Sequence, residues 1–570
     1  MLSRRRLGPT LALASVFTLA AACTDKPEPD AKTDADPGPK DESPDEPGTP
    51  EQVAGELPKV APATTDSAPI ADHGEVLATI QLPSGVAMRE FSALTDFMKP
   101  GASFLLRSQA PTMLEDAMGM SFDDAELEAP IAALVLDPLQ HPKPLALLVK
   151  VGDAEGLTKA AEAAKLEIRI RDGLALVGTS DVIEAAEDYA FDNLSAASDH
   201  SEIVLYPSKM IETFRPQIEE GIGSIGQLMA MQGGGASLGA FMDIYTKGLV
   251  SSGEQIERLV VSVSPGQDNI DVTMRAYPVA GGSMETFIAA QVPSDHTLLA
   301  KLPADAGLSM IMSGGMRAGD SREAIFGFGC EAMTAIYASG PSAEEWMALF
   351  VPWLDTTTGD FAAAIDMKFA LPADDAQPGT PPKMTVKWQG LYAISEAESS
   401  RSAWRNMLQA MVDSGGGATQ DMMGMKVETK LELDVLTYGD IPVDRYTTHI
   451  DPSSLTPDQR RVLEGSQLDQ EMQLAIFDTF GAMTTTMGST EEDGVMKTLI
   501  DAARGDGDQF EASGDLDAAL RESTARGESF VYYFDIGAIA PPETDIPFSA
   551  MSMSMGRDGS ALLTRFSFRR

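Results

Sequence analysis

The stretch IRIRDGLALVGTSDVIEAAEDYA, residues 168–190, contains both kinds of element from which this chain is built. Two short alternating apolar runs, 167–171 and 174–177, flank Asp172-Gly173, and this dipeptide in that setting predicts a β-hairpin with a tight turn. From Ser180 to about Tyr189 the apolar spacing becomes that of an amphipathic helix. A hairpin that leads directly into a helix favours helices packed on an antiparallel sheet, the α+β class.

The residues before this stretch support the same class. Residues 132–136 and 145–151 predict two strands joined by the turn DPLQHPKP. Asp153 is a suitable N-cap for a helix that extends to Lys165, because apolar side chains then recur on one face.

The order of elements returns later in the chain. Three segments have counterparts in the same order, and such ordered recurrence predicts a duplicated domain. The hairpin and helix of 168–190 match 474–503, with Gly178 on Gly488, and 200–211 matches 527–538, with Glu202 on Glu528 and Tyr206 on Tyr532. The third match sets 260–277 beside 550–568, placing Ser262, Ser264, Gly266, Asp268 and Arg275 on Ser552, Ser554, Gly556, Asp558 and Arg565.

These matches predict two tandem related α+β domains with mainly antiparallel sheets and packed helices, at residues 73–292 and 293–570. The second domain would be a duplication of the first with inserted elements. The additional elements are helices at 321–337, 343–354 and 398–412 and strands at 361–371 and 384–393. The alternative is two unrelated α+β domains that happen to contain similar hairpins.

The first 22 residues have the three parts of a secretory signal peptide. Arg4 to Arg6 supply the positive start, 7–19 is an apolar run too short to span a bilayer, and three alanines precede Cys23. The alternative is that the run remains as a membrane anchor. The site resembles a bacterial lipobox, although that family prefers Leu where Ala20 stands. The resemblance implies that Cys23 becomes a lipidated N-terminus, and Thr24 resembles a signal for sorting to the outer membrane.

Residues 23–72 are predicted to form a disordered, acidic, proline-rich tether, because almost nothing in them can be buried. A recruited acidic binding motif is the alternative. The chain of 570 residues carries 86 acidic and 42 basic side chains, and a net charge of -44 excludes nucleic acid as an expected partner. The remaining cysteine, Cys330, has no partner for a disulfide and is predicted to be a buried, inert thiol.

Two glycine-rich motifs are weak matches to catalytic or cofactor signatures. The glycines of 221–226 fit the dinucleotide-binding spacing, but a helix is predicted before them where a strand is required, so no cofactor is expected. Ser237 lies in a sequence typical of a nucleophile elbow, for which only His296 and His449 remain downstream as a base. A helix cap is the other interpretation of Ser237.

No metal site is expected. The five histidines have no ligand spacing, and Asp506, Asp508 and Glu511 do not meet the calcium-loop pattern. The 31 methionines are unusual, and they cluster at 227–232, 310–316, 419–425 and 551–555. They predict either irregular core packing or an adaptable greasy groove.

The arrangement after about residue 75 resembles uncharacterised bacterial envelope lipoproteins with tandem α+β units, a resemblance that implies no activity or site residue. We therefore predict a non-catalytic protein of the cell envelope, attached by lipid on Cys23 to what is expected to be the outer membrane. It would act as a binding or structural module for a protein or a hydrophobic ligand. A carrier of lipid or apolar peptide is the alternative, and a serine hydrolase acting through Ser237 is the third hypothesis.

Overall fold

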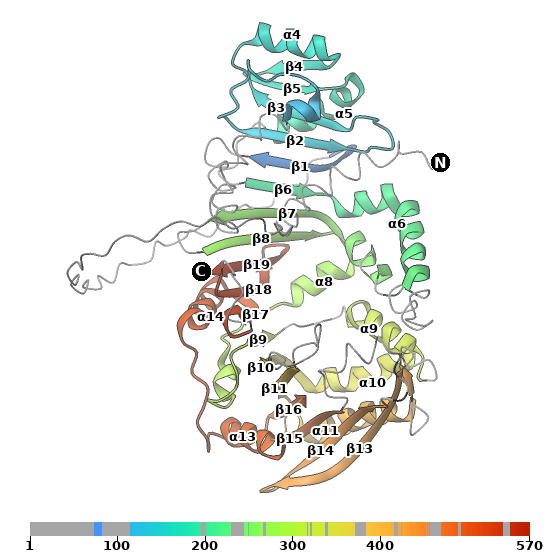
Figure 1. Ribbon diagram of the computed structural model, residues 1–570, viewed down its shortest axis with the longest axis vertical. Helices are drawn as coiled ribbons and strands as arrows, with labels where there is room; N and C mark the ends of the chain where they lie inside the picture. The colour runs from blue at the N-terminus through green and yellow to red at the C-terminus, as the bar shows by residue number, and fades with distance from the viewer. Residues whose placement is uncertain are drawn as a thin grey trace, which may run out of the picture. The chain divides into compact units, whose positions relative to one another are not determined.

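The computed structural model describes the chain from residue 73 onward, with gaps (Figure 1). The described residues are 73–82, 114–194, 201–229, 244, 246–248, 250–265, 269–315, 317, 319, 322–336, 340–370, 383–414, 420–422, 425–451, 453, 455, 469–487, 492–539 and 548–569. The predicted signal peptide, Cys23, the acidic tether and Ser237 lie outside these residues.

The described strands form one sheet. They are β1 (Val76–Leu82), β2 (Ile131–Leu136), β3 (Leu145–Lys150), β4 (Glu167–Arg171), β5 (Leu174–Gly178), β6 (Ser201–Leu205), β7 (Ile256–Pro265), β8 (Asn269–Pro278), β9 (Met310–Gly315), β10 (Thr357–Ala370), β11 (Lys383–Ile394), β12 (Gln420–Met422), β13 (Met425–Tyr438), β14 (Ile441–Ile450), β15 (Asp469–Phe477), β16 (Phe480–Met487), β17 (Glu528–Asp535), β18 (Ala550–Asp558) and β19 (Ala561–Arg569). All pairings among them are antiparallel, which confirms the predicted α+β class with antiparallel strands.

Helices connect these strands and pack on the sheet. They are α4 (Ala154–Ala164), α5 (Ser180–Asn193), α6 (Pro207–Met229), α8 (Ser283–Ala290), η3 (Thr297–Lys301), α9 (Arg322–Ile336), α10 (Ala343–Thr356), α11 (Ala397–Ser414), α13 (Glu492–Arg504), α14 (Gly514–Arg526) and α15 (Ile536–Ile539).

The turn predicted at Asp172-Gly173 and the helix cap predicted at Asp153 are both present in the structure. Asp172 and Gly173 both have positive φ, 54° and 78°, and this is the conformation that a two-residue hairpin turn requires. Asp153 caps α4 by accepting a hydrogen bond from the backbone N–H of Glu155, and Lys165 ends the helix in the left-handed conformation.

The order of pairing along the sheet is β4-β5-β3-β2-β1-β6-β7-β8 and then β19-β18-β17-β9-β10-β11-β16-β15-β14-β13-β12. Counted outward from the β8–β19 pair, one half has the order β8-β7-β6-β1-β2-β3-β5-β4 and the other has the order β19-β18-β17-β9-β10-β11-β16-β15. The strands of the two halves are therefore arranged in the same way relative to their order in the sequence. The helix that follows β5 is α5, and the helix that follows β16 is α13.

The residue-level matches from the sequence do not coincide with the strand register. Arg275 lies opposite Val260, whereas Arg565 lies opposite Ser554, the residue that the sequence match equates with Ser264. The last register pair before the turn is Pro265 with Ile270 in the hairpin β7–β8 and Asp558 with Ala561 in the hairpin β18–β19. The connection is therefore longer in β7–β8, and this shifts its register relative to that of β18–β19.

Each end of the sheet is covered on both faces. Leu134, Leu148 and Leu176 pack under α5, while their neighbours Leu147 and Val177 pack under α4 on the other face. At the other end, α13 and α14 cover one face with a core around Leu499, and α11 covers the other around Trp404. On the central strands between these cores, one face of the sheet carries half-buried apolar side chains and the other face carries polar and charged side chains.

Candidate functional site

The candidate site lies on the central strands β8, β19, β18, β17 and β9. In the segment MSMSM of β18 the residues alternate between the two faces of the sheet. Ser552 and Ser554 are buried on one face, whereas Met551, Met553 and Met555 are half-buried on the other.

Half-buried apolar side chains from five adjacent strands form what we call the methionine face. In strand order its members are Val272 and Met274, Phe566 and Phe568, Met551, Met553 and Met555, Tyr532 and Phe534, and Met310 and Met312. Strand register places them in rows across the sheet. One row is Val272, Phe566, Met553, Tyr532 and Met312.

Specific contacts order part of the methionine face. The hydroxyl of Tyr532 donates a hydrogen bond to the sulfur of Met310 at 2.8 Å, bridging two strands. The rings of Tyr532 and Phe534 meet edge to face with their centroids 4.5 Å apart. Burial raises the pKa of the Tyr532 hydroxyl, so it remains a neutral donor at ordinary pH. Sulfur and aromatic groups with some exposure make this face suitable for apolar or soft ligands.

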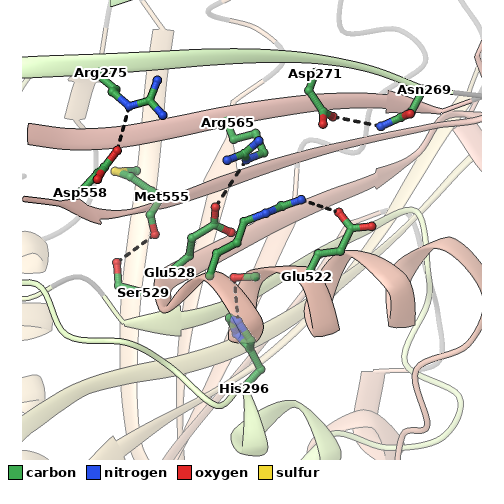
Figure 2. A network of polar contacts seen from close by, with 12 residues as sticks. Asn269, Asp271, Arg275, His296, Glu522, Glu528, Ser529, Met555, Asp558 and Arg565 are labelled. Carbon is green, nitrogen blue, oxygen red and sulfur yellow. Dashed lines mark hydrogen bonds and ion pairs between the residues drawn. The ribbon is translucent and has the colours of Figure 1, made fainter. Parts of the chain in front are cut away.

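The opposite face of the same strands carries a polar network (Figure 2). The Nε of Arg275 on β8 donates to Asp558 at the end of β18, at 2.8 Å, which links the two halves of the sheet. On β19, Arg565 forms an ion pair with Glu528 of β17, with 3.6 Å between Nε and Oε1. Burial lowers the pKa of Arg565, and the charge of Arg526 lowers it further, against the opposing effect of Glu528.

Glu528 is the most enclosed charge in this network. It is 1% exposed, and its carboxylate oxygens have no hydrogen-bond partner within the described part of the chain. Gly527 ends α14 in the left-handed conformation and so directs the chain into β17, where a bulge between 528 and 530 sets the carboxylate on this face. Opposite it, Gly556 leaves room for the backbone of Glu528.

The ends of α14 and β19 are joined by a further charge pair. Arg569 donates to Glu522 at 3.1 Å and lies 3.8 Å from Asp515. The network is held by side chains from strands and a helix that are far apart in the sequence. Its charges are paired with one another, which indicates a structural junction more than a reactive centre.

A second polar cluster lies at the beginning of β1. His141, 6% exposed, contacts Glu75 through Nε2 at 2.5 Å and Asp181 through Nδ1 at 2.8 Å. Burial alone would lower the pKa of His141, but hydrogen bonds to and charges of Asp181 and Glu75 outweigh it and raise the pKa. The two carboxylates approach opposite edges of the ring, so they cannot converge with it on one metal ion. Sequence spacing gave no sign of this cluster, because Glu75 and Asp181 are 66 and 40 residues away from His141.

The histidines considered as bases for Ser237 occupy other environments. His296, predicted in the link between domains, is 6% exposed, and both its ring nitrogens lie 3.2 Å from hydroxyls, those of Ser313 and Ser523. Burial lowers its pKa. His449 lies near the end of β14 and is exposed, in agreement with the strand predicted for it. Ser237 itself lies outside the described residues.

The glycine motif, Cys330 and the acidic loop that the sequence offered as candidate sites each lie within the scaffold of the fold. The glycine motif 221–226 lies inside α6, where a strand-to-helix turn would be required for a dinucleotide. Cys330 on α9 is buried against Trp346, and burial raises the pKa of its thiol. The backbone carbonyl of Asp508 accepts from Ala304, which ties that acidic loop to the start of the second half. Among the described residues no three histidine, cysteine or acidic side chains are placed to share a metal ion.

Comparison with known proteins gives no relative for this chain: no family model, no curated protein and no solved structure matches it. None of the helices that the structure describes combines the length and apolar character needed to cross a membrane.

Proposed function

We propose that this chain is a non-catalytic, lipid-anchored protein of the cell envelope that acts as a binding module. The N-terminal signal, the acceptor Cys23 and the acidic tether support the location. The partial exposure of the half-buried methionine face supports the binding role, because apolar patches that reach the surface mark interaction sites. The repeated strand order supports the further proposal that residues 73–292 and 293–570 are duplicated α+β units.

The location can be tested by labelling cells that produce the chain with a radioactive fatty acid. The wild-type chain should carry label and fractionate with the outer membrane. Cys23→Ser should carry none and should accumulate as the uncleaved precursor. Unlabelled, full-length wild-type chain in the cytosol would contradict the proposal.

The same face favours a second candidate function, a carrier of a hydrophobic ligand. Methionine side chains adapt to ligands of different shape, and aromatic side chains offer flat apolar contacts. A strongly acidic surface, with a net charge of -44, would keep such a carrier soluble while an apolar molecule is bound.

A solvatochromic dye distinguishes the two binding roles. Dye fluorescence that a fatty acid reverses would indicate a carrier, whereas dye binding that a fatty acid leaves unchanged would favour a protein partner. Met553→Gln should weaken dye binding because it places an amide in the middle of the face. Ser264→Glu, an exposed position on the opposite face of β7, is the matched control. Absence of dye binding to the folded wild-type chain would overturn both roles.

A further inference from the structure

The sulfur atoms of the methionine face have a chemistry beyond their apolar character. Three thioethers, those of Met551, Met553 and Met555, stand on one face of a single strand at alternate positions. Two more, Met310 and Met312, project from the same face of β9, with β17 between the two strands. All five side chains are half-buried.

We propose that the methionine face binds a soft monovalent cation, Cu⁺ or its analogue Ag⁺, through the thioether sulfur of Met553 together with that of Met551 or Met555. Thioethers are soft, neutral ligands that prefer Cu⁺, whereas Mg²⁺, Ca²⁺ and Mn²⁺ prefer carboxylate and carbonyl oxygens. The side chains that flank these methionines in the rows of the sheet are Phe530, Tyr532, Phe534, Thr564, Phe566 and Phe568, none of which is charged.

Strand geometry brings neighbouring sulfurs of β18 within reach of one ion. Alternate residues on a strand are roughly 6.5–7 Å apart along it, and methionine has three rotatable bonds with which to close that distance. Met551 and Met555 are about 13–14 Å apart along the strand, so the ion is held by Met553 together with one of these two. The methionines of β9 stand two strand spacings away, about 10 Å. Since the sulfur of Met310 already accepts the Tyr532 hydroxyl, we assign the ion to the β18 methionines and a supporting role to β9.

The surroundings favour a monovalent cation in two further ways. Tyr532 and Phe566 are the register partners of Met553 on the two neighbouring strands, and aromatic side chains attract cations to their faces. The net charge of -44 also raises the local concentration of cations near the chain. Because thioethers need not lose a proton to bind, the affinity should stay nearly constant across the pH range in which imidazole or thiolate sites change.

The test uses Ag⁺ and, under anaerobic conditions, Cu⁺ in competition with a chromophoric chelator. The full chain should carry Cys23→Ser and Cys330→Ala, so that no thiol contributes. In this background, replacing Met551, Met553 and Met555 by Leu should weaken binding at least tenfold. Met407→Leu with Met496→Leu, two buried methionines from α11 and α13, is the matched control and should leave the affinity unchanged.

Methyl NMR of the chain with labelled methionine gives a readout that does not require the variant to fold. The methyl signals of Met553 and of Met551 or Met555 should shift on addition of Ag⁺. Shifts confined to other methionines, unchanged affinity in the triple variant or no binding by the wild-type chain would each overturn the proposal.

The metal site and the proposed apolar binding role can fail separately. Leucine preserves the apolar surface, so the triple variant should bind Ag⁺ at least tenfold more weakly while it retains the dye. Dye binding without Ag⁺ binding in the wild-type chain would leave the binding module intact and refute only the metal site. Ag⁺ binding without dye binding would support the metal site and refute the apolar binding role.

Discussion

At the scale of single residues, His141 should make stability depend on pH. Its pKa is raised in the folded chain by Asp181 and Glu75, so the protonated ring stabilises the fold fully below the unfolded value of about 6.5. This stabilisation is lost as the pH rises through the folded pKa. The partners are half-exposed, so the contribution is on the order of 1 kcal/mol.

Denaturant unfolding of the wild-type chain and of His141→Gln over a pH series checks this prediction. The difference in free energy of unfolding should be largest at acid pH and should shrink above neutrality. Lys143→Gln, an exposed position in the same turn as His141, is the control. A difference that grows with increasing pH would have the wrong sign for a histidine held between two acids.

Glu528 offers a sharper test because it is buried. Arg565→Met should destabilise the chain by about 3–5 kcal/mol, since it leaves the carboxylate of Glu528 enclosed without its counterion. The double variant Glu528→Gln, Arg565→Met should cost less than the sum of the two single changes. Lys159→Met removes the exposed ion pair with Glu155 and should change stability by less than about 1 kcal/mol. Additive effects at 528 and 565 would show that the two charges are not coupled.

At the scale of elements, the pairing of β9 with β17 depends on a glycine. Gly314 has a φ of 116°, and a Cβ there would overlap the carbonyl oxygen of Ser529 on the facing strand. Gly314→Ala should therefore destabilise the chain by roughly 3 kcal/mol or more, through strain and through separation of the strands. Gly494→Ala in α13 is the matched control, since nothing lies near its Cβ and alanine should stabilise the helix by about 1 kcal/mol. Thermal unfolding of both variants measures the contrast, and equal effects would refute it.

The elements that the sequence predicted are those with local signals. The hairpin at Asp172-Gly173, the cap at Asp153 and the helices near 322–336 and 343–356 follow from turn, cap and periodicity patterns within a few residues. The pairing of β8 with β19 could not be predicted, because alternation sets which face a residue takes but not which distant strand it meets. The same applies to His141, whose partners are distant in sequence, and to the network around Glu528.

At the scale of the whole molecule, the β8–β19 pair joins the two halves of the sheet. Pairing extends from Leu562 opposite Ala276 to Arg569 opposite Asn269, and Ala561 contributes to the core of the first half. The Arg275–Asp558 ion pair crosses the same seam. We therefore expect the halves to unfold together, although each has its own core.

The tryptophans make this coupling measurable, because all four, Trp346, Trp353, Trp388 and Trp404, belong to the second half. Tryptophan fluorescence reports that half alone, whereas far-UV circular dichroism reports both. The two transitions should coincide in the wild-type chain and separate in Thr564→Pro, because proline removes a backbone donor from the middle of β19. Thr564→Val keeps the donor and should keep the transitions together. If they already separate in the wild-type chain, the halves are independent domains and the seam contributes little to stability.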